Sequence, residues 1–130
     1  MPIVTLIEYW PAKYFGSEEE QACMEHEFKL YGPVEMKEKE WGIERLVVCS
    51  QWEGSNARTI GVYKIPPTHL NDWIMDNAKR NSIYYMKLDG FDSEYEIWAS
   101  GEELNDVFKD EPFYKKRMAN YQVLFEKYSK

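Results

Sequence analysis

The sequence predicts an α+β fold in which a mainly antiparallel sheet packs against helices. Three observations carry this prediction. Short β-branched and aromatic runs recur along the chain, turn clusters of hairpin length separate some of them, and Ser-x-x-Glu pairs precede two helical stretches. The 130 residues are enough for one hydrophobic core without disulfides. We therefore expect a single domain over residues 1–130.

A strand and a helix are predicted at the start of the chain. The run "PIVTLIEYW" at residues 2–10 is β-branched and apolar, which is typical of a central strand. Ser17 and Glu20 have the spacing of a capping box, so we expect a helix to begin there. Gly32 followed by Pro33 ends that helix. Its apolar stripe consists of Met24, Phe28 and Tyr31.

A β-hairpin is predicted next. The charged segment at residues 34–42 fits either a loop or an edge strand. Residues 43–53 and 58–66 are rich in β-branched and aromatic side chains, and the cluster "GSNA" between them has the composition of a tight turn. The two consecutive prolines at the end of the second run stop the strand, because proline cannot donate to a sheet.

A second helix and a second hairpin follow. Thr68 is placed to cap the helix at its N-terminus. The apolar face of this helix consists of Leu70, Trp73, Ile74 and Ala78. Residues 82–89 and 94–100 are predicted to be strands joined by the turn "GFDS". In the second of them, acidic residues alternate with Tyr95 and Ile97, so we expect the acids to face solvent.

Two helices complete the chain. Ser100 and Glu103 form another capping box, and Pro112 suits the first turn of the last helix. The inward residues of the short helix are Leu104, Val107 and Phe108. The stripe of the last helix consists of Tyr114, Met118, Tyr121, Phe125 and Tyr128. The predicted core consists of Ile3, Leu6, Phe28, Leu46, Val48, Ile60, Val62, Trp73, Ile74, Ile97 and Phe125.

The order of the first six elements is strand, helix, strand, strand, helix, strand. This order matches a ferredoxin-like plait, βαββαβ, here followed by an added β-strand and two C-terminal helices. Other α+β sheets share the same order, so it leaves the pairing of the strands open. The predicted fold class is thus α+β, with a mainly antiparallel sheet in ferredoxin-like order.

Charge is unevenly distributed along the chain. The net charge is -7, and residues 89–111 contain nine acids against Lys109 alone, whereas residues 112–130 contain five bases and one acid. An acidic chain lacks the phosphate-neutralising surface that dominates nucleic-acid affinity, so we expect no direct nucleic-acid binding. No apolar run has spanning length, which predicts no membrane segment. Two cysteines, Cys23 and Cys49, predict free thiols and a cytoplasmic location.

The patterns that hold metals or nucleophiles are incomplete. A calcium loop needs acids at alternate positions and a glycine at the sixth, but here a glycine directly follows Asp89. Cys23 and His26 could supply half of a zinc site, and only Cys49 and His69 remain to complete it. The acids around Cys23 disfavour its thiolate. We therefore predict no metal site, no cofactor and no catalytic residue.

Glu8, within the apolar first strand, is the best candidate for a desolvated acid. We favour an edge position or a salt bridge to Arg45 or Arg58 over a catalytic role for it. The alternative function is a dimeric ferredoxin-like domain with an apolar pocket for a small ligand or small-molecule chemistry, in which Glu8 or His69 is the acid or base. The aromatic lining would consist of Trp52, Tyr63, Tyr84, Tyr85 and Trp98.

The leading hypothesis is a non-catalytic protein-interaction domain. Aromatic residues make up 16% of the chain, and tyrosine and tryptophan are enriched at interfaces. Clustered carboxylates would steer the domain onto a basic partner, and a nucleic-acid-handling protein offers such a surface. The chain would then inhibit or modulate that partner as a nucleic-acid mimic, and homodimerisation stays open. The predicted partner-binding residues are Asp89, Asp92, Glu94, Glu96, Trp98, Glu102 and Glu103.

Overall fold

The computed structural model describes residues 1–130, which form two compact units, Met1–Trp98 and Ala99–Lys130. The first unit contains the strands β1 (Ile3–Pro11), β2 (Glu44–Glu53), β3 (Asn56–Lys64) and β4 (Asp92–Trp98), the helices α1 (Glu18–Tyr31), α2 (Val34–Glu40) and α3 (Leu70–Lys87), and the 3-10 turns η1 (Ala12–Tyr14) and η2 (Pro67–His69). The second unit contains the helices α4 (Gly101–Phe108) and α5 (Pro112–Tyr128). The single domain over residues 1–130 stays a prediction.

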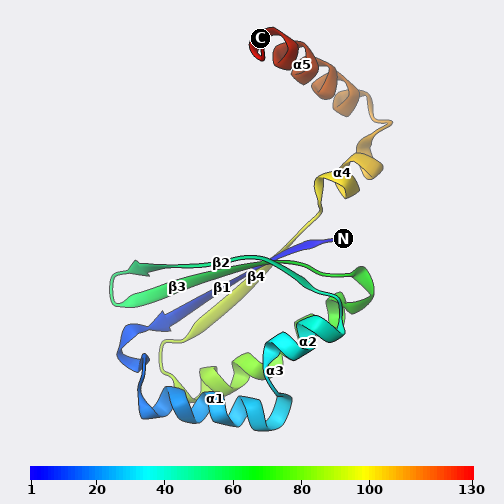
Figure 1. The fold of residues 1–130 in the computed structure, drawn as a ribbon. Coiled ribbons are helices and arrows are strands. Elements are labelled where there is room, and N and C mark those ends of the chain that lie inside the picture. Colours follow the sequence, from blue (N-terminus) through cyan, green and yellow to red (C-terminus); the bar gives the residue numbers. More distant parts are fainter. The chain divides into compact units, whose positions relative to one another are not determined.

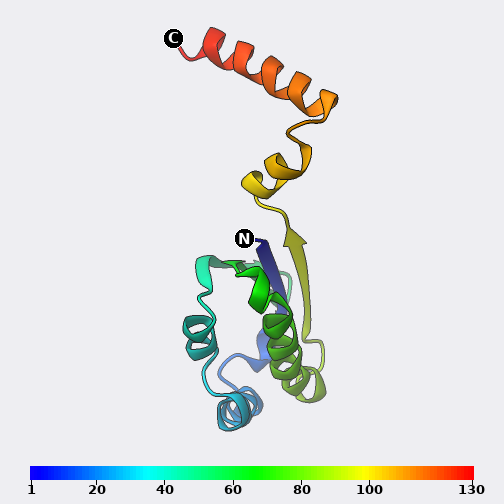
Figure 2. The ribbon, with the colours of Figure 1, turned by 90° about the vertical axis from the view of Figure 1, so that its right-hand side faces the viewer.

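The four strands form one antiparallel sheet in the order β2-β3-β1-β4. The helices α1, α2 and α3 lie on one side of this sheet (Figure 1), and the turned view shows the same layering (Figure 2). The strand predicted to be central is central, because β1 pairs with β3 on one side and with β4 on the other. The α+β class and the mainly antiparallel sheet are therefore confirmed.

The strand predicted at residues 82–89 is wrong, because these residues form no strand. Residues 82–87 are the last turns of α3, so the sheet has four strands and the added strand is absent. The buried residues Trp73, Arg80 and Tyr84 of α3 recur with helical spacing. Packing of that face onto the sheet and α1 outweighs the β propensity of the isoleucine and tyrosines in this stretch.

The helix caps agree with the sequence in part. Ser17 Oγ accepts the N–H of Glu20 at 3.1 Å, but the Glu20 carboxylate accepts the N–H of Gly16, one residue before the expected position. Ser100 and Glu103 form the complete capping box at the start of α4, as predicted. Both helix starts predicted from serine are therefore confirmed.

Two local elements differ from the prediction. The charged segment that was expected to be a loop or an edge strand forms α2, with Pro33 at its N-cap position. Thr68 does not cap α3, because it lies within η2 and His69 occupies the N-cap position. Pro112 does lie in the first turn of α5 as predicted. Pro33 has no side-chain oxygen that could accept a hydrogen bond at the helix start. The sequence therefore lacked the capping residue that usually indicates where a helix begins.

The core of Met1–Trp98 consists of two clusters between the sheet and the helices. One cluster contains Val4, Leu6, Tyr63, Ile65 and Trp73. The other contains Cys23, Tyr84, Leu88 and Phe91. Of the predicted core, Leu6 and Trp73 are buried, and Ile3, Ile60, Val62 and Ile74 are half-buried. The prediction is wrong for Phe28, Leu46, Val48, Ile97 and Phe125, which are 44–53% exposed.

These errors have structural causes. β2 and β4 are the edge strands of the sheet, so Leu46, Val48 and Ile97 have a neighbouring strand on one side only. α1 is rotated relative to its predicted stripe, because it buries Cys23 and Glu27 and leaves Phe28 exposed. Glu27 faces inward because two donors on α3 bind its carboxylate.

The unit Ala99–Lys130 buries little of its apolar surface. The ring of Phe108 on α4 contacts Phe113 and Tyr114 at the start of α5, with centroids 5.7 Å and 6.3 Å apart. Phe125 lies farther along α5 and stays exposed, because no element of this unit covers that part of the helix. None of the helices in the chain combines the length and apolar composition needed to cross a bilayer.

Candidate functional site

One candidate surface is the side of the sheet that carries no helix of Met1–Trp98 (Figure 1). Successive side chains of a strand point to opposite faces, and Val4, Leu6 and Tyr63 pack against α3. The alternate positions therefore face the other way. We name this the helix-free face, and it consists of Ile3, Thr5, Ile7 and Tyr9 of β1, Arg58, Ile60, Val62 and Lys64 of β3, Val47, Cys49 and Gln51 of β2, and Asp92, Glu94, Glu96 and Trp98 of β4.

An acidic row runs along the β4 edge of this face. Glu94 lies opposite Ile7 and Glu96 opposite Thr5 in the register of β1 and β4, while Tyr95 between them packs on the helix side against Trp73. Both glutamates are exposed, and no ion pair within Met1–Trp98 engages them. The prediction that Glu94 and Glu96 face solvent is confirmed, but Tyr95 and Ile97, which were predicted to face the core, are 43% and 47% exposed.

Asp92 and Trp98 mark the two ends of the acidic row. The Tyr85 hydroxyl donates to Asp92 Oδ1 at 2.7 Å and accepts the N–H of Ser93 at 2.6 Å. These bonds hold the carboxylate of Asp92 toward Tyr85 of α3, so the acids that point away from the helices along this row are Glu94 and Glu96. Trp98, at the other end, lies opposite Ile3 and is 53% exposed. The row thus ends in an exposed aromatic ring suited to contact with another molecule.

The structure brings together four of the seven predicted partner-binding residues. These four are Asp92, Glu94, Glu96 and Trp98. Asp89 is exposed in the loop before β4, where its N–H donates to the Tyr14 hydroxyl at 3.2 Å. Glu102 and Glu103 belong to the first turn of α4 in the unit Ala99–Lys130.

The centre of the helix-free face is apolar, a feature that the sequence analysis did not assign to a surface. Val62 of β3 lies opposite Val47 of β2, and Ile60 lies opposite Cys49. Val47 is 48% exposed, and Cys49 is exposed as well. The alternation of residues in β2 and β3 predicts an apolar surface here only once α1, α2 and α3 are known to lie on the opposite side of the sheet. An apolar centre beside an acidic edge resembles the core and rim of a protein interface.

A second cluster of functional groups is buried between α1 and α3. Arg80 donates to Glu27 at 2.8 Å and to Asp76 at 2.7 Å, and it also donates to the carbonyl oxygens of Tyr31 and Gly32. The Tyr84 hydroxyl donates to the second oxygen of Glu27 at 2.6 Å. Every charge in this cluster has a partner, so the cluster holds the two helices together.

Sequence reasoning missed this cluster. Its only trace in the sequence is that Arg80 and Tyr84, and likewise Cys23 and Glu27, are four residues apart on their helices. Charged residues at such positions are normally assigned to the solvent side of a helix.

Glu8 lies on the helix side of β1, opposite Thr59 of β3. Burial, and then the nearby carboxylate of Glu27, raise the pKa of Glu8 to about 7. The expected salt bridge is not formed. Arg45 instead pairs with Glu38 at 2.7 Å, and the Arg58 guanidinium lies over the ring of Tyr9. Glu8 is therefore the desolvated acid that the sequence singled out, and its raised pKa of about 7 lies within the neutral range.

The five aromatic residues proposed for a ligand pocket do not surround one cavity. Tyr63 lies in the cluster of Trp73, whereas Tyr84 lies in that of Cys23. Trp52 is 66% exposed and contacts Phe15. Trp98 belongs to the helix-free face, and Tyr85 lies on α3, from which its hydroxyl donates to Asp92 at the start of β4. His69 is the other proposed acid or base. Its Nδ1 lies 3.0 Å from Asp72 Oδ2, and its ring stacks on Trp41.

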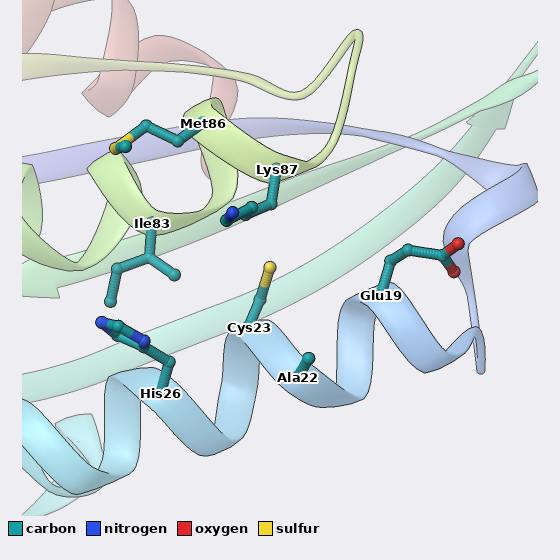
Figure 3. Close-up of a pocket in the computed structure, with 7 residues that line it drawn as sticks. All are labelled: Glu19, Ala22, Cys23, His26, Ile83, Met86 and Lys87. Atoms are coloured by element: carbon teal, nitrogen blue, oxygen red, sulfur yellow. The ribbon is translucent and has the colours of Figure 1, made fainter.

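A groove of about 370 Å³ lies between α1 and α3 (Figure 3). Its lining consists of Glu19, Ala22, Cys23, His26, Ile83, Met86 and Lys87. The pKa of the Cys23 thiol is raised, mainly by burial. The charge of Lys87 opposes this shift, and the charge of Glu20 adds to it. Cys23 is thus a protonated thiol rather than a nucleophile. No group of three or more His, Cys, Asp or Glu side chains in the chain is placed to hold a metal ion.

Comparisons with known proteins identify no family for this chain. The sequence matches no protein-family model and no curated protein. Among solved structures, the chain is similar to the de novo designed protein Ferredog-Diesel, with 14% sequence identity and a TM-score of 0.45 over 74% of this chain and 84% of that chain. At that TM-score we infer neither fold nor function from the likeness.

Proposed function

We propose that the chain is a protein-interaction domain that binds a basic, nucleic-acid-handling partner protein through the helix-free face and modulates or inhibits it. The observation that carries this proposal is the acidic row beside an apolar centre. Glu94 and Glu96 are exposed, have no ion-pair partner within Met1–Trp98, and lie next to Ile7 and Thr5 on the same face. Such charges accelerate association with a basic surface, and the apolar centre supplies the contact area.

The spacing of the acidic row supports mimicry of a phosphate backbone. Alternate residues of a β-strand are about 6.6–6.8 Å apart. The phosphates of one B-DNA strand rise about 3.4 Å each along the helix axis, so two such steps span about the interval between Glu94 and Glu96. Cations that line a groove for a nucleic-acid backbone can therefore pair with carboxylates at this spacing. The exposed ring of Trp98 continues the row where such grooves often provide surfaces for base stacking.

The finer description of the fold is part of the same proposal. We propose a ferredoxin-like plait for Met1–Trp98, supported by the antiparallel order β2-β3-β1-β4 and by the crossovers through α1 and α3. The cytoplasm is the proposed location. The unbonded state of Cys23 and Cys49 supports a reducing compartment.

The proposal is tested by comparing proteins captured from lysate of the source cells on the wild-type chain and on two variants. The surface variant combines Asp89→Asn, Asp92→Asn, Glu94→Gln and Glu96→Gln. The control combines Glu18→Gln, Glu19→Gln, Glu25→Gln and Glu40→Gln, which removes the same charge from exposed positions on α1 and α2.

We expect a nucleic-acid-binding protein on the wild-type chain and on the control, and its loss from the surface variant. DNA or RNA added to the lysate should displace it, because both ligands occupy the same basic groove. Capture of the same proteins by all three chains, or retention in the presence of excess nucleic acid, would contradict the proposal.

Glu8 favours a second candidate function. A carboxyl group with a pKa of about 7 is suited to general acid–base chemistry at neutral pH. This function would require a small molecule to reach Glu8 from between the sheet and the helices. Chemical-shift changes around Glu8 on addition of a small-molecule library, absent in Glu8→Gln, would favour it over the interaction surface.

A further inference from the structure

The helix α5 carries an apolar stripe that its own unit does not cover. The stripe consists of Tyr114, Met118, Tyr121, Phe125 and Tyr128. Met118 is 46% exposed, Phe125 is 53% exposed and Tyr128 is 74% exposed. Steps of four and three residues repeat along the stripe, which is the spacing of the a and d positions of a coiled coil.

The apolar stripe runs along most of α5, so leaving it exposed to water reduces the stability of the helix. A helix of 17 residues is about 25 Å long, and most of the stability of a helix in a protein comes from packing of its apolar face. Within Ala99–Lys130 the contacts of Phe108 reach only the first turn of α5, at Phe113 and Tyr114. The remaining turns gain stability when another apolar helix face covers them.

The charges at the two ends of α5 are complementary to those of a second copy that lies antiparallel to it. Lys115, Lys116 and Arg117 lie in the first turns of α5, and Asp110 and Glu111 lie just before the helix. Two copies of α5 side by side in parallel would place these like charges against each other. In the antiparallel direction, Asp110 and Glu111 lie beside the C-terminal end of the second helix, where Lys127 and Lys130 are located. The helix dipoles also attract in this direction.

We propose that two copies of this chain associate through antiparallel pairing of their α5 helices along the stripe. Met118 of each copy then packs near Tyr121 of the other, and Tyr114 packs near Phe125. The stripe spans about two heptads, fewer than the three to four of a sustained coiled coil, so the dimer is reversible and depends on protein concentration.

Sedimentation of the full-length chain over a range of concentrations tests the association. We expect the wild-type chain to shift from monomer to dimer as concentration rises. Met118→Glu combined with Phe125→Glu should keep the chain monomeric over the whole range, because it places charges at two a positions. Ala119→Glu combined with Val123→Glu adds the same charges to the opposite side of α5 and should leave the dimer intact.

A monomer at every concentration, or a dimer unaffected by Met118→Glu with Phe125→Glu, would overturn the proposal. Direction is tested in a background of Cys23→Ser and Cys49→Ser. A mixture of Asp110→Cys and Ser129→Cys chains should form the mixed disulfide dimer on oxidation. Predominant dimers of Ser129→Cys with itself would show parallel pairing and contradict the antiparallel arrangement.

Discussion

The Tyr84 hydroxyl on α3 donates a hydrogen bond of 2.6 Å to Glu27 Oε1 on α1. Arg80 donates to the other oxygen of the same carboxylate at 2.8 Å. Burial, and then the hydrogen bond to Glu27, raise the pKa of Tyr84, so its hydroxyl stays a donor throughout the neutral range. These two helices, which lie on one face of the sheet, are thereby joined by a fully paired buried charge, and the other face carries no helix of Met1–Trp98.

Arg80→Met should be strongly destabilising. The substitution leaves the carboxylates of Glu27 and Asp76 inside the helix layer without their cation. Loss of one partner of a buried ion pair typically costs about 3–5 kcal/mol. Urea unfolding should show this loss, while Lys79→Met at an exposed neighbouring position should change the free energy of unfolding by less than about 0.5 kcal/mol. Equal effects of the two substitutions would show that the cluster is not structural.

Glu8→Gln should change the dependence of stability on pH. The pKa of Glu8 is raised from 4.5 to about 7 in the folded protein, so the folded state binds this proton more tightly than the unfolded state. Stability is therefore highest below about pH 4.5 with respect to this group, and it falls as pH rises through about 7.

At pH 8 the Gln variant should be more stable than the wild type by on the order of 2–3 kcal/mol, and the advantage should vanish near pH 4. Urea titrations of both proteins at several pH values give the difference directly. A constant difference between the two proteins across this range would mean that Glu8 titrates as it does in the unfolded chain.

The two thiols should react at different rates. Cys49 is exposed on the helix-free face, whereas Cys23 is 2% exposed and its pKa is raised by burial. Mass spectrometry after brief alkylation of the native protein should find label at Cys49 well before Cys23, with no disulfide between them. Label appearing at both cysteines at the same rate would contradict this burial.

Trp73→Ala should cost about 3–5 kcal/mol of unfolding free energy, because a large ring is removed from the core cluster. The ring is 4% exposed and contacts Tyr63 and Tyr95. Trp98→Ala provides a control with the same side chain at an exposed position, where we expect a loss below about 1 kcal/mol. Similar losses in thermal or urea unfolding would show that the assigned core is incorrect.

The fold could be predicted from local patterns wherever one cause dominated. The capping box of Ser100 and Glu103, the end of α1 at Gly32 and the central position of β1 depend on short-range chemistry. The sequence did not assign residues 82–89 correctly. Their β-branched and aromatic content predicts a strand, whereas residues 82–87 continue a helix whose buried residues pack against α1 and the sheet.

The candidate site was predicted in the same uneven way. The acidic row of β4 follows from alternation within one strand, so Glu94 and Glu96 were placed correctly on a solvent face. The apolar centre depends on pairing between strands that are far apart in sequence, such as Ile7 with Ile60. The raised pKa of Glu8 depends first on its burial between the sheet and the helices and then on Glu27, which is brought near by the packing of α1.

The central claim is that the acidic row of the helix-free face steers the chain onto a basic partner. Its most direct test is the association rate of the captured partner with the wild-type chain, the surface variant and the control, measured by stopped flow from low salt to about 1 M, where the Debye length is about 3 Å. We expect the surface variant to associate more slowly at low salt, the difference to disappear at high salt, and the control to match the wild type. Folding should be unaffected, because exposed charges contribute about 0–1 kcal/mol per pair. A surface variant that associates at the wild-type rate at every salt concentration would contradict the account.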